Sequence, residues 1–254
     1  MIAVHGASGT IGRRIAAALV DRGADVRLIG RDRPRLLAVA DELGLTPSDV
    51  TAVATHDHAA LVAAFADATC VIGAAGPFAR VGAAIAAAAL AADAHYLDVA
   101  VEPGFVRALY EEHESEARRR ARAVASGVGT LGALGDWAAD WAATSLGDGG
   151  ELDHVDVAYA FDGARFATGM TRSIVSALGG PALAWRRGRW VDVPATARGR
   201  TIDFGELGSR RARALATTEA VTVPRRWPVR AVDTWVAPTG APLTSFSTGR
   251  ATTR

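Results

Sequence analysis

The first 125 residues alternate between short apolar runs and longer amphipathic segments, and this alternation restricts the fold more than any other feature. Short runs such as IAVHG at 2–6 are typical of buried strands, whereas the longer segments show helical periodicity. Strands that alternate with helices predict a doubly wound α/β fold, in which helices cover both faces of a parallel sheet. We expect strands at 2–6, 25–30, 50–55, 69–76, 94–100 and 121–126, and helices at 10–23, 34–44, 58–68, 80–92 and 103–120.

Residues 127–254 follow a different pattern. The glycine-rich segment GVGTLGALG leads into a helical pattern, and several later segments alternate with the period of two that is typical of strands. This half predicts a smaller α+β domain with an antiparallel sheet, so we place a domain boundary between residues 126 and 127. The expected helices are 136–146 and 170–180, and the expected strands are 153–163, 187–195, 199–205 and 230–237.

Composition excludes several classes of chemistry. All 28 basic residues are arginine, which rules out a Schiff-base lysine, a P-loop lysine and a Tyr-x-x-x-Lys pair. The single cysteine, Cys70, excludes a multi-cysteine metal site, and we expect no metal. The net charge of +1 argues against binding to bulk nucleic acid or acidic lipid. The first strand leaves no room for a signal peptide and the longest apolar run is too short to span a bilayer, so we expect a cytoplasmic protein.

The segment HGASGTIG at 5–12 joins the first expected strand to the first expected helix. Glycines at this spacing permit a tight turn, the approach of backbone N–H groups to a pyrophosphate, and close packing of the helix on the sheet. The phosphates would then lie at the helix N-terminus, which favours negative charge. The alternative is a strand-to-helix turn without a ligand. We expect residues 1–126 to form a Rossmann domain whose first cofactor-binding residues are Gly6, Ser8, Gly9, Thr10, Ile11 and Gly12.

The second strand ends in GRDR at 30–33, a sequence that bears on the choice between NAD and NADP. A lone carboxylate at this place would bind the ribose 2′-hydroxyl of NAD. Arg31 suits the 2′-phosphate of NADP, with Arg33 as a second cation, and Asp32 is then explained as the N-cap of the next helix. We therefore expect NADP (NADPH) as the cofactor.

The fourth strand ends in GAAGPF at 73–78. Ligands of doubly wound sheets bind beyond the carboxyl ends of the strands, so we expect Ala75, Gly76 and Pro77 to contact the cofactor. Gly76 allows a ring to approach closely, and Pro77 stiffens the loop. Phe78 either packs near the nicotinamide and substrate or belongs to the core.

The stretch AAGPFARVGAAIAAAALAADAHYLDVAVEP resembles the AGPF…G…Y-x-D…E region of the saccharopine dehydrogenase-like NADP-binding oxidoreductases, in particular the trans-acting enoyl reductase subgroup. The opening GASGTIG, the segment GALGDWAADWAA at 132–143 and the segments TGMTRSIVSAL, RRGRWVDVP and RTIDFG are similar to that family too. The chain differs in having Val101 before Glu102, where the family tends to have glycine, and in ending soon after STGR, as a member shortened at the C-terminus would.

The resemblance implies a Rossmann domain that binds NADP, a second α+β domain that shapes the substrate pocket and often dimerises, and hydride transfer to an imine or an activated alkene. Thr171 and Arg172 match the start of a helix in the second domain. Arg172 would bind a substrate carboxylate or a carrier-linked acyl group, or would instead form a salt bridge between domains. We expect a small-molecule substrate, free or carrier-bound, and a homodimer.

Candidates for the chemistry lie where the fifth strand ends: His95, Tyr96, Asp98 and Glu102, of which we assign roles to the last three. Tyr96 and Asp98 are two residues apart and share one face of the strand, and Glu102 follows. Asp98 would hold a substrate amine or relay a proton, and Tyr96 would donate a proton. The structural alternatives are a helix cap or an arginine pair for Asp98, and a hydrogen bond to backbone for Tyr96.

Three functions fit the sequence. The first is an NADP-dependent oxidoreductase that reduces an imine or enoyl group. The second is a non-redox descendant, such as a cyclase, isomerase or lyase, which uses the same cleft with the nucleotide absent or structural. The third is a binding subunit of a larger synthase. The glycine-rich loop and Arg31 favour the first.

Overall fold

The computed structural model describes residues 1–147, 150–161, 182–193 and 199–237 of the 254-residue chain. The predicted helix at 170–180, and with it Thr171 and Arg172, lies outside the described residues. Among the helices of the described ranges, none has the length and apolar character needed to cross a membrane.

The first half forms the predicted doubly wound sheet. Its six strands are parallel and lie in the order β3-β2-β1-β4-β5-β6, so the direction of winding reverses between β1 and β4. Ligands of such sheets bind where the winding reverses, beyond the carboxyl ends of the strands. The strands are β1 (Ile2–His5), β2 (Val26–Gly30), β3 (Val50–Ala52), β4 (Cys70–Gly73), β5 (His95–Asp98) and β6 (Val124–Ala125), and the helices are α1 (Thr10–Val20), α2 (Arg33–Glu42), α3 (His58–Phe65), α4 (Phe78–Ala91) and α5 (Pro103–Arg119).

Helices cover both faces of this sheet, as the apolar character of its strands requires. Val4 of β1 packs with residues of α1 and α2, and Ala3 packs with residues of α3, α4 and α5. Successive side chains of one strand point to opposite faces, so β1 contributes a side chain to the core cluster on each side of the sheet. The core of this half therefore lies in two layers, one on each side of the sheet.

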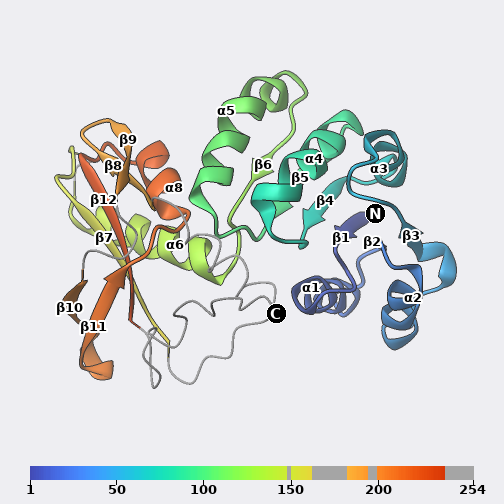
Figure 1. The fold of residues 1–254 in the computed structure, drawn as a ribbon, viewed down its shortest axis with the longest axis horizontal. Coiled ribbons are helices and arrows are strands. Elements are labelled where there is room, and N and C mark those ends of the chain that lie inside the picture. The colour runs from blue at the N-terminus through green and yellow to red at the C-terminus, as the bar shows by residue number, and fades with distance from the viewer. Residues whose placement is uncertain (148–149, 162–181, 194–198, 238–254) are drawn as a thin grey trace, which may run out of the picture.

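The second half contains another six-stranded sheet. Five of its strands lie in the order β10-β11-β12-β8-β9, and β7 pairs with β12 from outside this path. Figure 1 shows this sheet at the opposite end of the molecule from β1–β4, with α5 and α6 between the two sheets. Its elements are α6 (Thr130–Ser145), β7 (Val155–Ala160), β8 (Ala182–Arg186), β9 (Arg189–Val193), β10 (Gly199–Asp203), β11 (Ser209–Ala214), α8 (Glu219–Arg226) and β12 (Ala231–Ala237).

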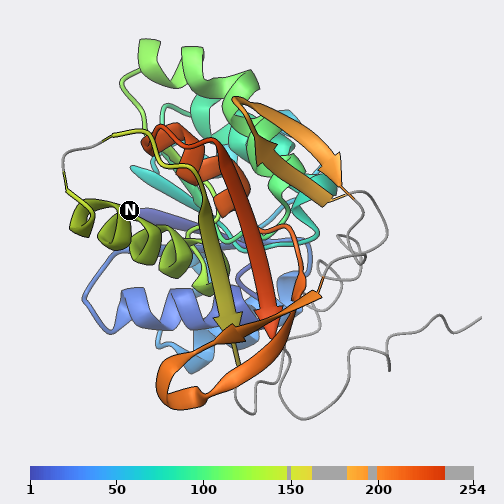
Figure 2. The ribbon, with the colours of Figure 1, turned by 90° about the vertical axis from the view of Figure 1, so that its left-hand side faces the viewer.

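The second sheet is antiparallel, as predicted, except at one pair. Strands β7 and β12 run side by side in the same direction, from Val155 opposite Val232 to Ala160 opposite Ala237 (Figure 2). The sequence analysis did not identify β8, β11 or α8. Strand β11 is the arginine-rich segment SRRARA, and α8 spans eight residues and contains Pro224, so neither has the pattern typical of its class.

A buried carboxylate connects the two halves of the chain. Asp98, at the end of β5, has no exposed surface and accepts hydrogen bonds from Ser126 Oγ at 2.7 and 2.8 Å and from the N–H of Gly127 at 3.0 Å. The N–H of Ala100 donates a further bond at 2.9 Å. These bonds fix the direction in which the chain leaves the first sheet after β6.

A second buried carboxylate holds the start of α6. Glu219 has no exposed surface and accepts hydrogen bonds from the hydroxyls of Tyr159 and Thr217, while the N–H of Gly132 donates to the Tyr159 hydroxyl oxygen at 3.0 Å. A Cβ on Gly135 would lie 2.1 Å from Glu219 Oε1, so the chain can pass here only without a side chain. The glycines of GVGTLGALG thus let this segment pack directly on a polar cluster.

Glu102 caps a helix from outside that helix. Its Oε1 accepts the N–H of Phe78, the first residue of α4, at 3.1 Å, and its Oε2 accepts the N–H of Val101 at 3.0 Å. The side chain is 6% exposed, and a carboxylate at a helix N-terminus is favoured by the helix dipole. Glu102 therefore fixes the loop that joins β4 to α4.

Replacing Glu102 should destabilise the protein because two buried N–H groups would lose their acceptor. We expect Glu102→Ala to lower the free energy of unfolding by about 2–4 kcal/mol, and Glu102→Gln to lower it less because the amide keeps one acceptor oxygen. Urea unfolding measures both, with Glu112→Ala, at an exposed position of α5, the helix that follows Glu102, as the control. A Glu102→Ala variant as stable as the control would contradict this assignment.

Asp136, in the middle of α6, is a carboxyl group with a raised pKa. Burial raises its pKa from 3.8 to about 6, with smaller contributions from the charges of Glu219 and Asp140, against a hydrogen bond from Thr222 that lowers it. Thr222 Oγ1 lies 2.6 Å from Asp136 Oδ1. Between about pH 4 and 6 the folded state therefore holds a proton on Asp136 that the unfolded chain has already released.

Because the folded state holds the extra proton, ionisation of Asp136 destabilises the fold as the pH rises from about 4 to 6. We expect Asp136→Asn to be more stable than the parent protein at pH 7 by about 1–2 kcal/mol, and to lose this advantage at pH 4. Asp140→Asn is the control with the opposite sign, because the hydrogen bond from Arg226 lowers the pKa of Asp140. Denaturant unfolding across this pH range measures both, and a pH-independent difference for Asp136→Asn would refute the raised pKa.

Candidate functional site

The loop between β1 and α1 has the compact geometry that its glycines predict. Gly6 has a φ of +85°, which favours glycine, and a Cβ there would lie 2.8 Å from the Cβ of Ala75. A Cβ on Gly12 would lie 2.3 Å from the carbonyl oxygen of Gly6. The first turn of α1 thus packs directly on the loop, and the loop packs on the segment after β4.

The N-terminus of α1 is open to an anion. Gly9 is the N-cap, no side chain caps the helix, and Gly9 and Thr10 are exposed. By contrast, Asp32 and Asp57 cap α2 and α3 by accepting backbone N–H groups. The first-turn N–H groups of an uncapped helix, together with its dipole, form a site for phosphate. The hydroxyls of Ser8 and Thr10 lie at the same end of the helix.

The segment after β4 meets this loop at the point where the winding of the sheet reverses. The N–H of Ala74 donates to the carbonyl of His5 at 2.8 Å, and Ala75 contacts Gly6. Gly76 is exposed, and Pro77 precedes α4. The structure therefore brings together the two segments, 6–12 and 75–77, that the sequence analysis assigned to the cofactor.

Phe78 belongs to the core. It is 5% exposed, its ring centroid lies 5.8 Å from that of Phe105, and both residues pack in the cluster formed by α3, α4 and α5. Of the two alternatives for this residue, the geometry favours packing over substrate contact.

The end of β2 supplies two exposed arginines. Asp32 Oδ1 accepts the N–H of Arg35 at 3.1 Å, so its carboxylate serves as the N-cap of α2. Arg31 follows the last residue of β2, and Arg33, the first residue of α2, donates to the carbonyl of Val50 at 3.4 Å. Because the carboxylate of Asp32 is engaged by the helix, Arg31 and Arg33 leave a positive charge for a ligand beyond the end of β2.

The candidates for proton transfer lie beneath the loop after β4. Tyr96 and Asp98 have no exposed surface and Glu102 has 6%, and both carboxylates accept backbone N–H groups. Burial raises the pKa of Asp98, against the hydrogen bonds from Gly127, Ala100 and Ser126 that lower it. Burial and the charge of Asp98 hold the pKa of Tyr96 well above its usual range. A Cβ on Gly73 would lie 2.9 Å from the Tyr96 hydroxyl, so Gly73 leaves room for this ring.

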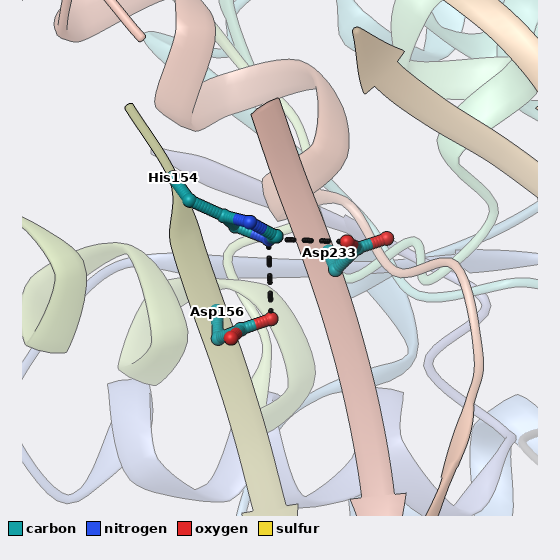
Figure 3. Close-up of side chains that lie close together, drawn as sticks. All are labelled: His154, Asp156 and Asp233. Atoms are coloured by element: carbon teal, nitrogen blue, oxygen red, sulfur yellow. Dashed lines mark ion pairs between the residues drawn. The ribbon is translucent and has the colours of Figure 1, made fainter. Parts of the chain in front are cut away.

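A histidine and two aspartates gather where β7 and β12 run side by side (Figure 3). His154 Nε2 lies 3.3 Å from Asp156 Oδ1 and 3.1 Å from Asp233 Oδ2. Arg200 Nη1 lies 2.7 Å from Asp156, and Arg186 pairs with Asp233. Because arginines already neutralise both carboxylates, we interpret this cluster as an ion-pair network that joins neighbouring strands.

Sequence reasoning missed His5, the last residue of β1. Its side chain is 2% exposed and ends the strand directly before the glycine-rich loop. The signal was present in the sequence, because His5 is the one polar residue in the strand IAVH.

Comparison with known proteins gives matches that agree with this geometry. The family model for the saccharopine dehydrogenase NADP-binding domain matches residues 2–131, just over half of the 254-residue chain. Two Mycobacterium tuberculosis proteins, from strains H37Rv and CDC 1551, are provisionally named trans-acting enoyl reductases. Each is 34% identical to this chain over 121 residues, which are 46% of this chain and 29% of the relative. The chain thus covers less than a third of those relatives.

A solved structure supports the fold of both halves. Saccharopine dehydrogenase (L-Glu forming) from Saccharomyces cerevisiae, in its apo form, aligns with 92% of this chain and 54% of its own, with a TM-score of 0.60 and 16% identity. At this identity, the likeness concerns the fold alone. The family match, which covers the uncapped α1 and both loops at the switch point, identifies the chain as a member of the saccharopine dehydrogenase NADP-binding domain family, a family of oxidoreductases.

Proposed function

We propose that this protein is an NADP-dependent oxidoreductase that transfers hydride to an imine or to an activated enoyl double bond. The observation that carries the proposal is the uncapped N-terminus of α1, which lies where the winding of the sheet reverses and beside the loop after β4. Membership of a family of NADP-binding domains supports the choice of cofactor. The two mycobacterial relatives named as enoyl reductases support an activated alkene as acceptor.

In this proposal each end of the cofactor has a binding segment. The N–H groups at the start of α1 and the hydroxyls of Ser8 and Thr10 bind the pyrophosphate. Arg31, with Arg33 beside it, binds the 2′-phosphate through charge-assisted hydrogen bonds. The segment 75–77 forms the wall against which the nicotinamide packs. NADPH, when bound, supplies the hydride that adds to the electrophilic carbon of the substrate.

The burial of Tyr96, Asp98 and Glu102 favours positioning roles for them. Asp98 holds the residues after β6, and Glu102 holds the start of α4, so each fixes a backbone segment. Tyr96 is protonated at neutral pH, as an ordinary tyrosine is, and burial raises its pKa further. Direct proton transfer by any of the three stays a prediction, and it requires a path from buried side chains to the substrate.

The test is a titration of the purified protein with NADPH and with NADH, followed by nicotinamide fluorescence. We expect tighter binding of NADPH, and we expect Arg31→Ala to weaken NADPH binding by about 10–100-fold while NADH binding stays unchanged. Arg35→Ala is the matched control, because Arg35 is an exposed arginine in the first turn of α2, and its backbone N–H, which the substitution keeps, donates to the N-cap Asp32. Loss of NADH and NADPH binding in equal measure would contradict the role of Arg31.

An assay of NADPH consumption with the same protein distinguishes reduction from non-redox chemistry. Consumption of NADPH with a panel of imines and enoyl thioesters, measured by absorbance, supports the oxidoreductase. Tight binding of NADPH without consumption by any acceptor favours the non-redox descendant, in which the nucleotide is structural. If neither nucleotide binds, the proposal is wrong.

A further inference from the structure

His5 is a buried imidazole without a hydrogen bond. It is 2% exposed, and neither of its ring nitrogens has a partner in the described part of the chain. Most buried polar side chains are hydrogen-bonded, and an apolar residue, like the others of β1, would avoid the cost of burying unpaired nitrogens. A polar side chain at this position therefore calls for an explanation other than packing.

The register of the sheet shows which face His5 occupies. Ile29 of β2, His5 of β1 and Gly73 of β4 lie opposite one another in a single row. Ala3 and Ile29 pack in the cluster beneath α3 and α4, and because alternate residues of a strand share a face, His5 points to that side too. Gly73 has no side chain, and the Tyr96 hydroxyl lies 2.9 Å from where its Cβ would be.

Arg31 belongs to the same face. It follows Ile29 by two residues, and the alternation of β2 carried past Gly30 places it on the side of His5. Burial, together with the charge of Arg31, lowers the pKa of His5 to about 4. At neutral pH the imidazole is therefore uncharged, with one N–H and one free lone pair, and a lone pair is what a guanidinium N–H requires as acceptor.

The loop that follows His5 is fixed to the end of β2. The N–H of Gly6 donates to the carbonyl of Ile29 at 2.7 Å, and the N–H of Ala7 lies 3.3 Å from the same oxygen. The position of the imidazole relative to Arg31 is thus set by the sheet and by the phosphate loop together.

We propose that His5 is a positioning residue for Arg31: when a dinucleotide binds, a ring nitrogen of His5, which has no partner in the described part of the chain, accepts a guanidinium N–H and so orients Arg31 toward the 2′-phosphate. This inference rests on the NADP binding proposed above. It assigns His5 a role in selecting 2′-phosphorylated dinucleotides over those with a free 2′-hydroxyl. The effect passes through Arg31, because His5 itself is covered.

The test is a double-mutant cycle between His5 and Arg31, with dissociation constants for NADPH and NADH as the readout. His5→Phe and His5→Leu both remove the acceptor and leave an apolar side chain suited to β1. We expect each to lower the preference for NADPH over NADH by roughly tenfold. In an Arg31→Ala background, the same substitutions should leave the remaining preference unchanged. His5→Gln, which restores an acceptor oxygen, should recover part of the preference.

His95→Phe is the matched control. His95 is the first residue of β5, so it lies at the end of the strand away from the loops of the proposed site. Its Nδ1 accepts the N–H of Ala123 at 2.9 Å. Its replacement should leave the ratio of the two dissociation constants unchanged. Thermal unfolding of each variant identifies any that fail to fold. If one of the two apolar variants of His5 does not fold, the double-mutant cycle can still be measured with the other.

The outcomes separate this inference from the proposed function. If the parent protein prefers NADPH and Arg31→Ala removes the preference, but the apolar His5 variants retain it, then only the role of His5 is overturned. Equal weakening of NADPH and NADH, or a change in preference that persists without Arg31, would also overturn it. If the parent protein binds neither nucleotide, the proposed function fails first and the inference fails with it.

Discussion

The close packing of α1 on the loop before it is the constraint on which the site depends. A Cβ at Gly12 would lie 2.3 Å from the carbonyl oxygen of Gly6, and a Cβ at Gly6 would lie 2.8 Å from Ala75. These contacts bring the uncapped N-terminus of α1, the end of β1 and the loop after β4 to one place. The backbone there forms the helix N-terminus at which we propose that the pyrophosphate binds, and Arg31 is the side chain to which we assign selectivity.

Buried carboxylates stabilise the surroundings of this site. Glu102 holds the start of α4 from 24 residues away, and Asp98 holds Ser126 and Gly127 across 28 and 29 residues. For both carboxylates, hydrogen bonds from the chain take the place of the bonds to water that burial removes. Glu102 thereby supports the end of the loop after β4, and Asp98 supports the chain after β6.

Much of the first half could be predicted from sequence because its determinants are local. Apolar runs, helix caps such as Asp32 and the glycine spacing act within a few residues, and the structure confirms the order of strands and helices. It also places the segments 6–12 and 75–77 next to each other. The partners of Glu102, Asp98 and Glu219 could not be predicted, because sequence periodicity carries no information on contacts between distant residues. Strand β11 and helix α8 escaped for a related reason, since their pairing partners, and not their own patterns, determine their structure.

Amide hydrogen exchange with and without NADPH, read out by mass spectrometry, tests the central claim most directly. We expect NADPH to slow exchange in the peptide covering residues 6–13, at the start of α1, and in the peptide covering 74–78. We expect little change in β9 and β10 of the second sheet. Protection confined to the second sheet, or no protection at all at saturating NADPH, would contradict a cofactor site at the switch point.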